Sequence, residues 1–424
     1  MPDGFRRTRA AQVTRTGIDM GEFRSGWPTI LASAAGACAG LTGLAFYTFG
    51  LFVKPLSEAF GWTRGEITLG MSFITLGTVA TAPLVGWLID RFGVRRVAAP
   101  SLIGIAIAFV LVSRAGPQLA TFYAACLAVA VLGCATSPVS WTRAVSSRFV
   151  RGRGLALGLT LLGSASAGVV GVPVVQWLIV NHGWRSGYLG ISAFAVLVAL
   201  PLVTLLLRPG PEPQRVSHSR ALPGLTLAQA LRTGAFWTIA LAILVLITAQ
   251  SGAIIHLVPL LTDRGLAPVE AAKLAGVMGI SVFLSRVIVG GLLDRFSPPL
   301  VAGLTLLAPV AAMAILAVCG DSRPAIVVAV VLLGLAAGAE IDFLSFFAAR
   351  HFGMGAYGAI YGWLFAMFSL GNGVGAPLVG AIYDISGGYQ IALWGAAALF
   401  ALGAALFGSL AWRPVWAGTP TTEA

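Results

Sequence analysis

Charged residues are scarce in this sequence. Only 10% of the 424 residues are Asp, Glu, Lys or Arg, and Lys54 and Lys273 are the only lysines among 27 cations. A soluble domain carries about 25% charged residues, so this chain cannot cover a soluble surface of its size. Hydrophobic residues make up 58% of the chain and occur in long stretches. The composition therefore excludes a soluble protein and indicates one embedded in lipid.

Patterns typical of catalysis and metal binding are also missing. The four cysteines show no Cys-x-x-Cys spacing, and the four histidines form no His-Glu-x-x-His pair. No serine lies in Gly-x-Ser-x-Gly, and neither lysine follows a glycine as a P-loop requires. We therefore expect no enzyme activity, no ATP-driven pumping, no cofactor and no metal. The net charge of +12 comes from short clusters between apolar stretches, which argues against nucleic acid as a partner.

Twelve apolar stretches reach the roughly 20 residues that a spanning helix needs. Stretches of this length exclude barrel strands, so the fold class is an all-α membrane protein in a lipid bilayer. The first six are expected at about 27–53, 66–89, 94–113, 118–142, 154–180 and 187–207, and the second six at about 235–260, 268–293, 298–319, 324–349, 356–383 and 388–411.

These stretches divide the chain into two six-helix bundles, 27–207 and 235–412, joined by a linker, 208–234. The linker opens with Pro and Gly, and a short interfacial helix is expected over 225–233. Residues 1–26 and 413–424 are expected to be tails. If the N-terminus is cytoplasmic, the segments on that side hold nineteen Lys and Arg residues and the outer segments hold seven. This bias predicts that both termini are cytoplasmic. We expect the chain to lie in a bacterial inner membrane.

The two halves repeat each other at a constant offset. Asp90-Arg91 and Asp294-Arg295 follow similar apolar runs and lie 204 residues apart. The same offset relates Gly154 to Gly358, Gly158 to Gly362, Gly171 to Gly375 and Pro173 to Pro377. Parallel repeats of this kind place a substrate path between the two halves of a transporter.

The run Gly86-x-Leu88-x-Asp90-Arg91-x-Gly93-x-Arg95-Arg96 resembles the signature between helices 2 and 3 of the major facilitator superfamily. The resemblance covers about residues 27–412 and implies twelve helices in two pseudo-symmetric bundles. It also implies a secondary transporter working by alternating access, which we expect to be monomeric. In the family this cluster latches the halves together. Asp294 and Arg295 carry the second copy, which is degraded because Ser297 replaces the glycine.

Within that superfamily the chain looks most like the monocarboxylate porter and oxalate/formate antiporter group. The run Arg148-Phe149-Val150-Arg151-Gly152-Arg153-Gly154 is similar to that group's entry into helix 5, and Arg286 falls where the group places a substrate-binding Arg. The chain departs from the group in three places. The acidic-Gly start before helix 1 is missing, Val282 replaces an Asp, and Tyr47 replaces a Lys.

Arg286 is the most deeply placed cation. It lies eight residues before Asp294, or roughly 12 Å along a helix at 1.5 Å per residue. Its planar guanidinium suits a carboxylate, so we interpret it as a substrate-binding residue. The alternative is a permanent ion pair with Glu340 or Asp342.

Glu340 and Asp342 are acidic residues near the middle of the tenth stretch. They lie two positions apart and so cannot face the same way on a helix. A carboxyl group that takes up a proton in one access state and releases it in the other would couple transport to protons. The alternative is that both serve structural pairing.

Tyr47, His256 and Asn372 are further candidates for substrate binding. Each has a more ordinary interpretation as a hydrogen-bonded residue between helices. Arg143, near the end of the fourth stretch, is interpreted as an anchor at the membrane surface.

The sequence thus predicts proton-coupled transport of a small organic anion, such as a monocarboxylate. The small-molecule substrate, protons and the bilayer are the expected partners. A proton-driven exporter of hydrophobic compounds and an anion exchanger remain as alternatives.

Overall fold

The computed structural model describes residues 20–150, 152–207, 224–319 and 322–413. The expected tail over residues 1–19, the linker over 208–223 and the tail over 414–424 lie outside the described residues. Within them, 12 helical segments are long and apolar enough to cross a membrane. The predicted all-helical membrane fold is therefore confirmed. We number these segments as spans 1 to 12 in chain order.

The first half contains spans 1 to 6. Span 1 begins at Met20, earlier than expected, and continues to Phe60. Span 1 holds α1 (Met20–Ala39), α2 (Phe46–Thr48) and α3 (Val53–Phe60), and spans 2 and 3 are α4 (Arg64–Phe92) and α5 (Val94–Ser113). Span 4 holds α6 (Leu119–Gly133) and α7 (Pro138–Ser146), span 5 holds α8 (Arg153–Ser166) and α9 (Val172–His182), and span 6 holds α10 (Trp184–Phe194) and α11 (Leu200–Leu206).

The second half begins with a short helix and contains spans 7 to 12. The short helix, α12 (Leu227–Leu231), lies where the sequence predicts one. Spans 7 to 9 are α13 (Gly234–Asp263), α14 (Pro268–Arg295) and α15 (Pro298–Val318). Span 10 holds α16 (Arg323–Ala337) and α17 (Glu340–Phe352), and spans 11 and 12 are α18 (Tyr357–Ser386) and α19 (Gln390–Ser409).

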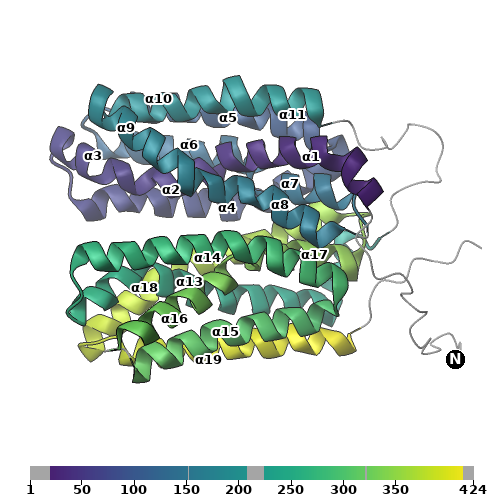
Figure 1. Ribbon diagram of the computed structural model, residues 1–424. Helices are drawn as coiled ribbons and strands as arrows, with labels where there is room; N and C mark the ends of the chain where they lie inside the picture. Colours follow the sequence, from purple (N-terminus) through teal and green to yellow (C-terminus); the bar gives the residue numbers. More distant parts are fainter. Residues whose placement is uncertain (1–19, 151, 208–223, 320–321, 414–424) are drawn as a thin grey trace, which may run out of the picture.

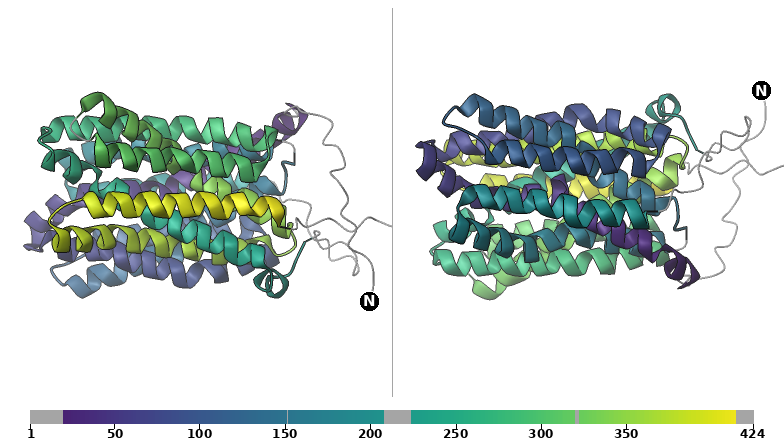
Figure 2. Two further views of the ribbon diagram at one scale, coloured as in Figure 1. Left: turned by 90° about the horizontal axis from the view of Figure 1, so that it is seen from below. Right: turned by 90° about the horizontal axis from the view of Figure 1, so that it is seen from above.

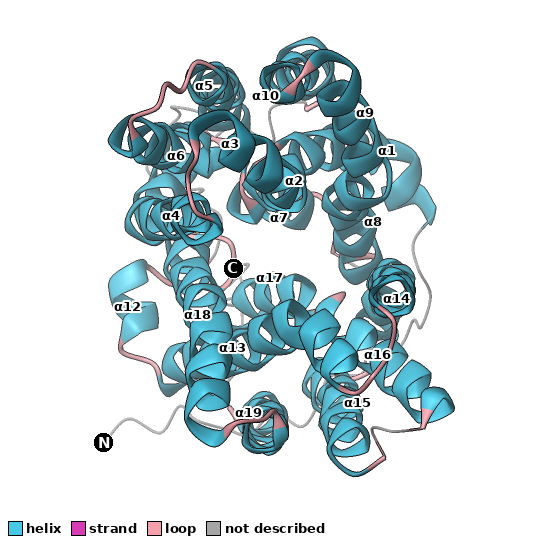
Figure 3. Cartoon of the chain, turned by 90° about the vertical axis from the view of Figure 1, so that its left-hand side faces the viewer, coloured by secondary structure: helices cyan, strands magenta, loops and turns pink. Residues whose placement is uncertain are grey.

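Figure 1 shows the two halves as two layers, one from α1 to α11 and the other from α13 to α19. Figure 2 shows the same arrangement from below and above, with the start of α1 and the end of α19 at one end of the molecule. The layers meet where α4 packs against α18 and α8 packs against α14, as the end-on view in Figure 3 also shows. One apolar core lies in the first half and includes Phe52 and Trp141. A second includes Phe343 and Phe400 of the second half and continues into the first half at Val85.

Glycines allow the two halves to approach closely. Gly86 in α4 lies against the backbone of Gly358 in α18, and Gly290 in α14 lies against the backbone of Gly154 in α8. A Cβ atom on any of the four would overlap with the facing backbone. The repeat relates the two contacts, because 204 residues separate Gly86 from Gly290 and Gly154 from Gly358.

Spans 4 and 10 are interrupted at corresponding points. A short 3₁₀ segment, Cys134–Thr136, and Ser137 separate α6 from α7. Gly338 and Ala339 separate α16 from α17. Gly338 lies 204 residues after Cys134. The interruption in span 10 makes Glu340 the first residue of α17, so an acidic side chain begins a half-helix within the span.

Candidate transport site

Asp90 lies near the end of α4 and binds the start of α18 in the other half. Its two carboxylate oxygens accept hydrogen bonds from the N–H groups of Gly358 (2.9 Å) and Ala359 (2.7 Å). N–H groups in the first turn of a helix lack an acceptor within that helix, and the helix dipole favours a negative charge there. The predicted contact between this carboxylate and a neighbouring helix N-terminus is therefore present.

Asp294 makes the equivalent contact between α14 and α8. Its carboxylate accepts hydrogen bonds from the N–H groups of Gly154 (2.6 Å) and Leu155 (2.9 Å). The carboxylate contact is thus complete, although Ser297 stands where the first copy of the signature has a glycine. We call these two contacts the Asp90 latch and the Asp294 latch, and the end of the molecule that holds them the latch end.

The Asp90 latch contains an arginine whose place the sequence analysis missed. Arg143 in α7 lies 2.6 Å from the Asp90 carboxylate and donates to the carbonyl oxygen of Met354 (3.3 Å). Its interpretation as a surface anchor is wrong, because the residue is only 9% exposed and is paired with a buried carboxylate. The sequence did contain a signal for this ion pair. Arg143 lies one turn inside the end of α7, and a cation within a span needs a partner.

The remaining residues of the signature lie at the surface of the latch end. Arg95 and Arg96 in α5 and Arg295 at the end of α14 are exposed, which suits contact with lipid phosphates. Arg91 lies over an indole ring of its own helix, with the guanidinium carbon 5.2 Å from the ring centre. Gly93 joins α4 to α5 with a φ of +83°, a backbone conformation that residues other than glycine rarely adopt.

Arg286, Glu340 and Asp342 come together between α14 and α17. Arg286 is 3% exposed and Asp342 is 0% exposed. The Arg286 guanidinium interacts electrostatically with both carboxylates. Glu340 and Asp342 therefore both act on one cation, although they lie two positions apart on the helix.

This cluster contains unsatisfied polar atoms. Among the described residues Arg286 forms no ion pair at a distance of 4.0 Å or less. The Nε and Nη1 atoms of Arg286 and both carboxylate oxygens of Asp342 are buried without a hydrogen-bond partner. Buried charges left in this way are costly unless water or a ligand supplies the missing partners.

Two tyrosines complete the cluster. Tyr47, from span 1 in the first half, interacts electrostatically with Arg286 and Glu340. Tyr361 in α18 interacts with Asp342 and Arg286, and the sequence analysis did not name it. Tyr361 lies in a row of rings on one face of α18, with Tyr357 at 5.5 Å and Phe365 at 6.2 Å between ring centres. This four-residue spacing of aromatic residues was a signal present in the sequence.

A cavity of about 520 Å³ lies between the halves beside this cluster. Phe46 and Phe365 line both the cavity and the cluster, since Phe46 packs on Tyr47 and Phe365 stacks on Tyr361. Asn372, predicted to bind substrate, also lines this cavity. Spans 1, 2 and 11 supply the other lining residues, which are Leu41, Thr42, Ala45, Met71, Ile74, Thr75, Thr78, Phe368 and Ser369.

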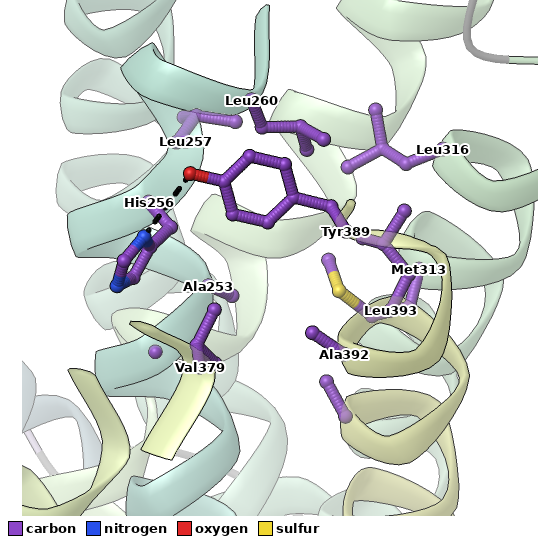
Figure 4. A pocket seen from close by; sticks show the side chains of 12 residues that line it. Ala253, His256, Leu257, Leu260, Met313, Leu316, Val379, Tyr389, Ala392 and Leu393 are labelled. Atoms are coloured by element: carbon purple, nitrogen blue, oxygen red, sulfur yellow. Dashed lines mark hydrogen bonds between the residues drawn. The ribbon is translucent and has the colours of Figure 1, made fainter. Parts of the chain in front are cut away.

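His256 lies in a second cavity, of about 350 Å³, within the second half (Figure 4). Its Nδ1 atom lies 3.3 Å from the hydroxyl of Tyr389, and its Nε2 atom lies 3.0 Å from the carbonyl oxygen of Ala376. Both ring nitrogens are thus engaged within the second half, and His256 is in a different cavity from Asn372. Among the described residues, no three His, Cys, Asp or Glu side chains are grouped so that they could hold a metal ion.

The comparison with known families decides the identity of this fold. Residues 35–365 match the family described as Major Facilitator Superfamily. The chain belongs to this superfamily. It is a secondary carrier with many membrane spans and is not an enzyme.

Relatives of this transporter include monocarboxylate transporters. It is 27% identical to monocarboxylate transporter 13 of Bos taurus over 371 residues, which cover 86% of this chain and 84% of the relative. It is also 27% identical to human monocarboxylate transporter 11 over 398 residues, which cover 89% of this chain and 82% of the relative. Its fold is similar to that of the human organic anion transporter MFSD10, with a TM-score of 0.70, 17% identity and coverage of 91% of this chain and 99% of the other.

Proposed function

We propose that this transporter carries a small organic anion, such as a monocarboxylate, together with protons. The observation that supports an anion is Arg286, whose buried Nε and Nη1 atoms have no hydrogen-bond partner. A planar guanidinium binds a carboxylate through two parallel hydrogen bonds, and a substrate carboxylate would supply the missing partners. The monocarboxylate transporters among the relatives support the same class of substrate.

Glu340 and Asp342 are the proposed coupling groups. Both carboxylates interact with the guanidinium that would bind the substrate. An anion bound to Arg286 neutralises the positive charge that stabilises these two carboxylates. Anion binding therefore favours uptake of a proton by one of them. Release of the anion on the other side of the membrane reverses both steps.

The cavity between the halves suits the remainder of the substrate. Phe46, Met71 and Phe365 give it apolar walls, and Thr75 and Asn372 supply polar groups. We propose that Tyr47 and Asn372 contact the substrate together with Arg286. The apolar walls also favour a second candidate function, proton-driven export of a hydrophobic compound.

The two latches are proposed to hold the latch end closed in one access state and to release it in the other. The excess of Lys and Arg in the segments on that side supports a cytoplasmic location for the latch end and both termini. We propose that the transporter acts as a monomer in a bacterial inner membrane.

The proposal is tested by measuring the pH inside proteoliposomes after carboxylates are added outside. We expect a small monocarboxylate to acidify the lumen and Arg286→Gln to abolish most of this signal. Loss of hydrogen bonds to a charged group costs about 1.5–3 kcal/mol, which is roughly a tenfold to hundredfold loss of affinity. The matched control is Arg323→Gln, since Arg323 has a side chain that is 71% exposed.

Undissociated acids cross lipid unaided, so empty liposomes provide the baseline. Acidification that persists in Arg286→Gln would contradict the assignment of the anion site. No signal above the baseline would contradict proton symport and would favour exchange or export, which counterflow and efflux assays then separate.

A further inference from the structure

The first turn of α1 binds the turn that leads into α8. The carboxylate of Glu22 accepts hydrogen bonds from the N–H of Val150 (3.3 Å) and the N–H of Gly152 (3.1 Å). Glu22 precedes the apolar part of span 1, so its place in a helix was not expected from hydropathy. This contact joins two segments of the same half that are far apart in the sequence.

Aromatic packing fixes the same contact. The rings of Phe23 and Phe149 lie 5.1 Å apart, and Phe149 is fully buried. A Cβ atom on Gly26 would overlap with the Phe149 ring, and one on Gly152 would overlap with the Phe23 ring. Phe149 and Gly152 therefore pack closely against α1.

The turn held by Glu22 also carries one partner of the Asp294 latch. Only Arg153 separates Gly152 from Gly154, whose N–H donates to Asp294. The guanidinium of Arg153 donates to the carbonyl oxygen of Phe149 (3.0 Å) and interacts electrostatically with Asp294 and Glu22. The direction of the latch N–H groups thus depends on the position of this turn.

The second half holds its own latch turn in a corresponding way. The N–H of Leu225, just before α12, donates to the carbonyl oxygen of Phe352 (2.8 Å), and Gly224 pairs with Gly353 across an antiparallel bridge. These residues precede Gly358, a partner of the Asp90 latch. The offset of 204 residues places the two contacts in the same part of each half, because it relates Phe352 to Arg148 and Gly224 to Met20, which lie two residues before Val150 and Glu22. The first half uses a carboxylate where the second half uses the backbone.

We propose that Glu22 is a positioning residue for the Asp294 latch, and that the polar start of span 1 and the segment before span 7 stabilise the closed latch end. The proposal rests on the alternating access proposed above. Removal of the Glu22 carboxylate leaves the turn free to move, so the Asp294 contact weakens and the state open at the latch end becomes more populated.

The test is the distance between spin labels at Leu205 and Trp412, in a protein whose native cysteines are replaced by serine. These residues are 76% and 85% exposed and lie in different halves at the latch end. We expect two distances in the unsubstituted protein, and a roughly threefold to tenfold shift toward the longer one in Glu22→Ala. Glu22→Gln keeps an acceptor oxygen and should shift the ratio less. Asp294→Asn should shift it in the same direction.

The matched control is Glu58→Ala, which removes an exposed carboxylate at the other end of span 1. Leu225→Pro removes the N–H that binds Phe352 and should shift the ratio from the second half. Unchanged populations in a stably folded Glu22→Ala protein would overturn the proposal. The measurement needs no substrate, so a failed anion assay leaves it valid. A single distance under all conditions in the unsubstituted protein would overturn alternating access and this proposal together.

Discussion

Single side chains show two ways of keeping charge inside this transporter. Arg143 and Asp90 have side chains that are 11% and 12% exposed, and they meet at 2.6 Å. Arg286 and Asp342 are buried as deeply but form no ion pair among the described residues. A complete pair holds two helices in place, whereas an incomplete one is costly and is kept where a ligand completes it.

We expect Arg143→Met to destabilise the protein strongly. The substitution leaves Asp90 as a buried carboxylate without its cation, and breaking a buried pair costs about 3 kcal/mol or more. Thermal unfolding in detergent measures the change as a lower Tm. Lys54→Met is the control, because Lys54 lies 3.8 Å from Glu58 with a side chain that is 81% exposed, and exposed pairs contribute little. Equal Tm values for the two variants would contradict the structural role of Arg143.

At the scale of whole helices, hydropathy and the repeat predicted the twelve spans and both latch carboxylates. They did not predict the start of α1 at Met20, because the added turn is polar and is held by Glu22 rather than by lipid. The break at Gly338 also escaped prediction, because no proline marks it and the close packing of Gly338 against α14 is a contact between distant segments. Arg143 and Tyr361 were missed because their partners come from other helices.

Two adjacent glycines in α14 test the close contact between helices. A Cβ atom on Gly290 would overlap with the Gly154 backbone, whereas one on Gly291 would meet open space. We expect Gly290→Val to cost roughly 1–3 kcal/mol through overpacking and to separate α14 from α8. Gly291→Val changes helix propensity equally but should leave stability and transport intact. Thermal unfolding and transport of both variants measure the difference. Equal loss in both would show that the contact with α8 is not the cause.

On the scale of the whole molecule, the proposed coupling requires the proposed proton site and anion site to respond to each other in both access states. Asp342 and Arg286 come from α17 and α14 in the second half, and Tyr47 comes from the first half. The cluster therefore spans the interface that alternating access would open and close.

We expect Asp342→Asn to separate anion movement from proton movement. An amide cannot take up the proton, so acidification should be lost while counterflow exchange of the labelled anion remains. Both assays on the same proteoliposomes give the comparison. Asp384→Asn, an exposed substitution in α18, is the control. Loss of both activities together would contradict a coupling role.

The helix contacts at Gly86–Gly358 and Gly290–Gly154 are related by two-fold symmetry. Each half contributes one glycine of each equivalent pair to the interface. A single six-helix unit with these residues contains both surfaces of its own two-fold dimer, as in an isologous interface. Fusion of two such units leaves one copy free to change without a matching change in the other. Ala82 occupies the position that corresponds to Arg286. The proposed anion site is therefore a departure from symmetry that a fused chain permits. An identical pair of subunits would carry the same site twice.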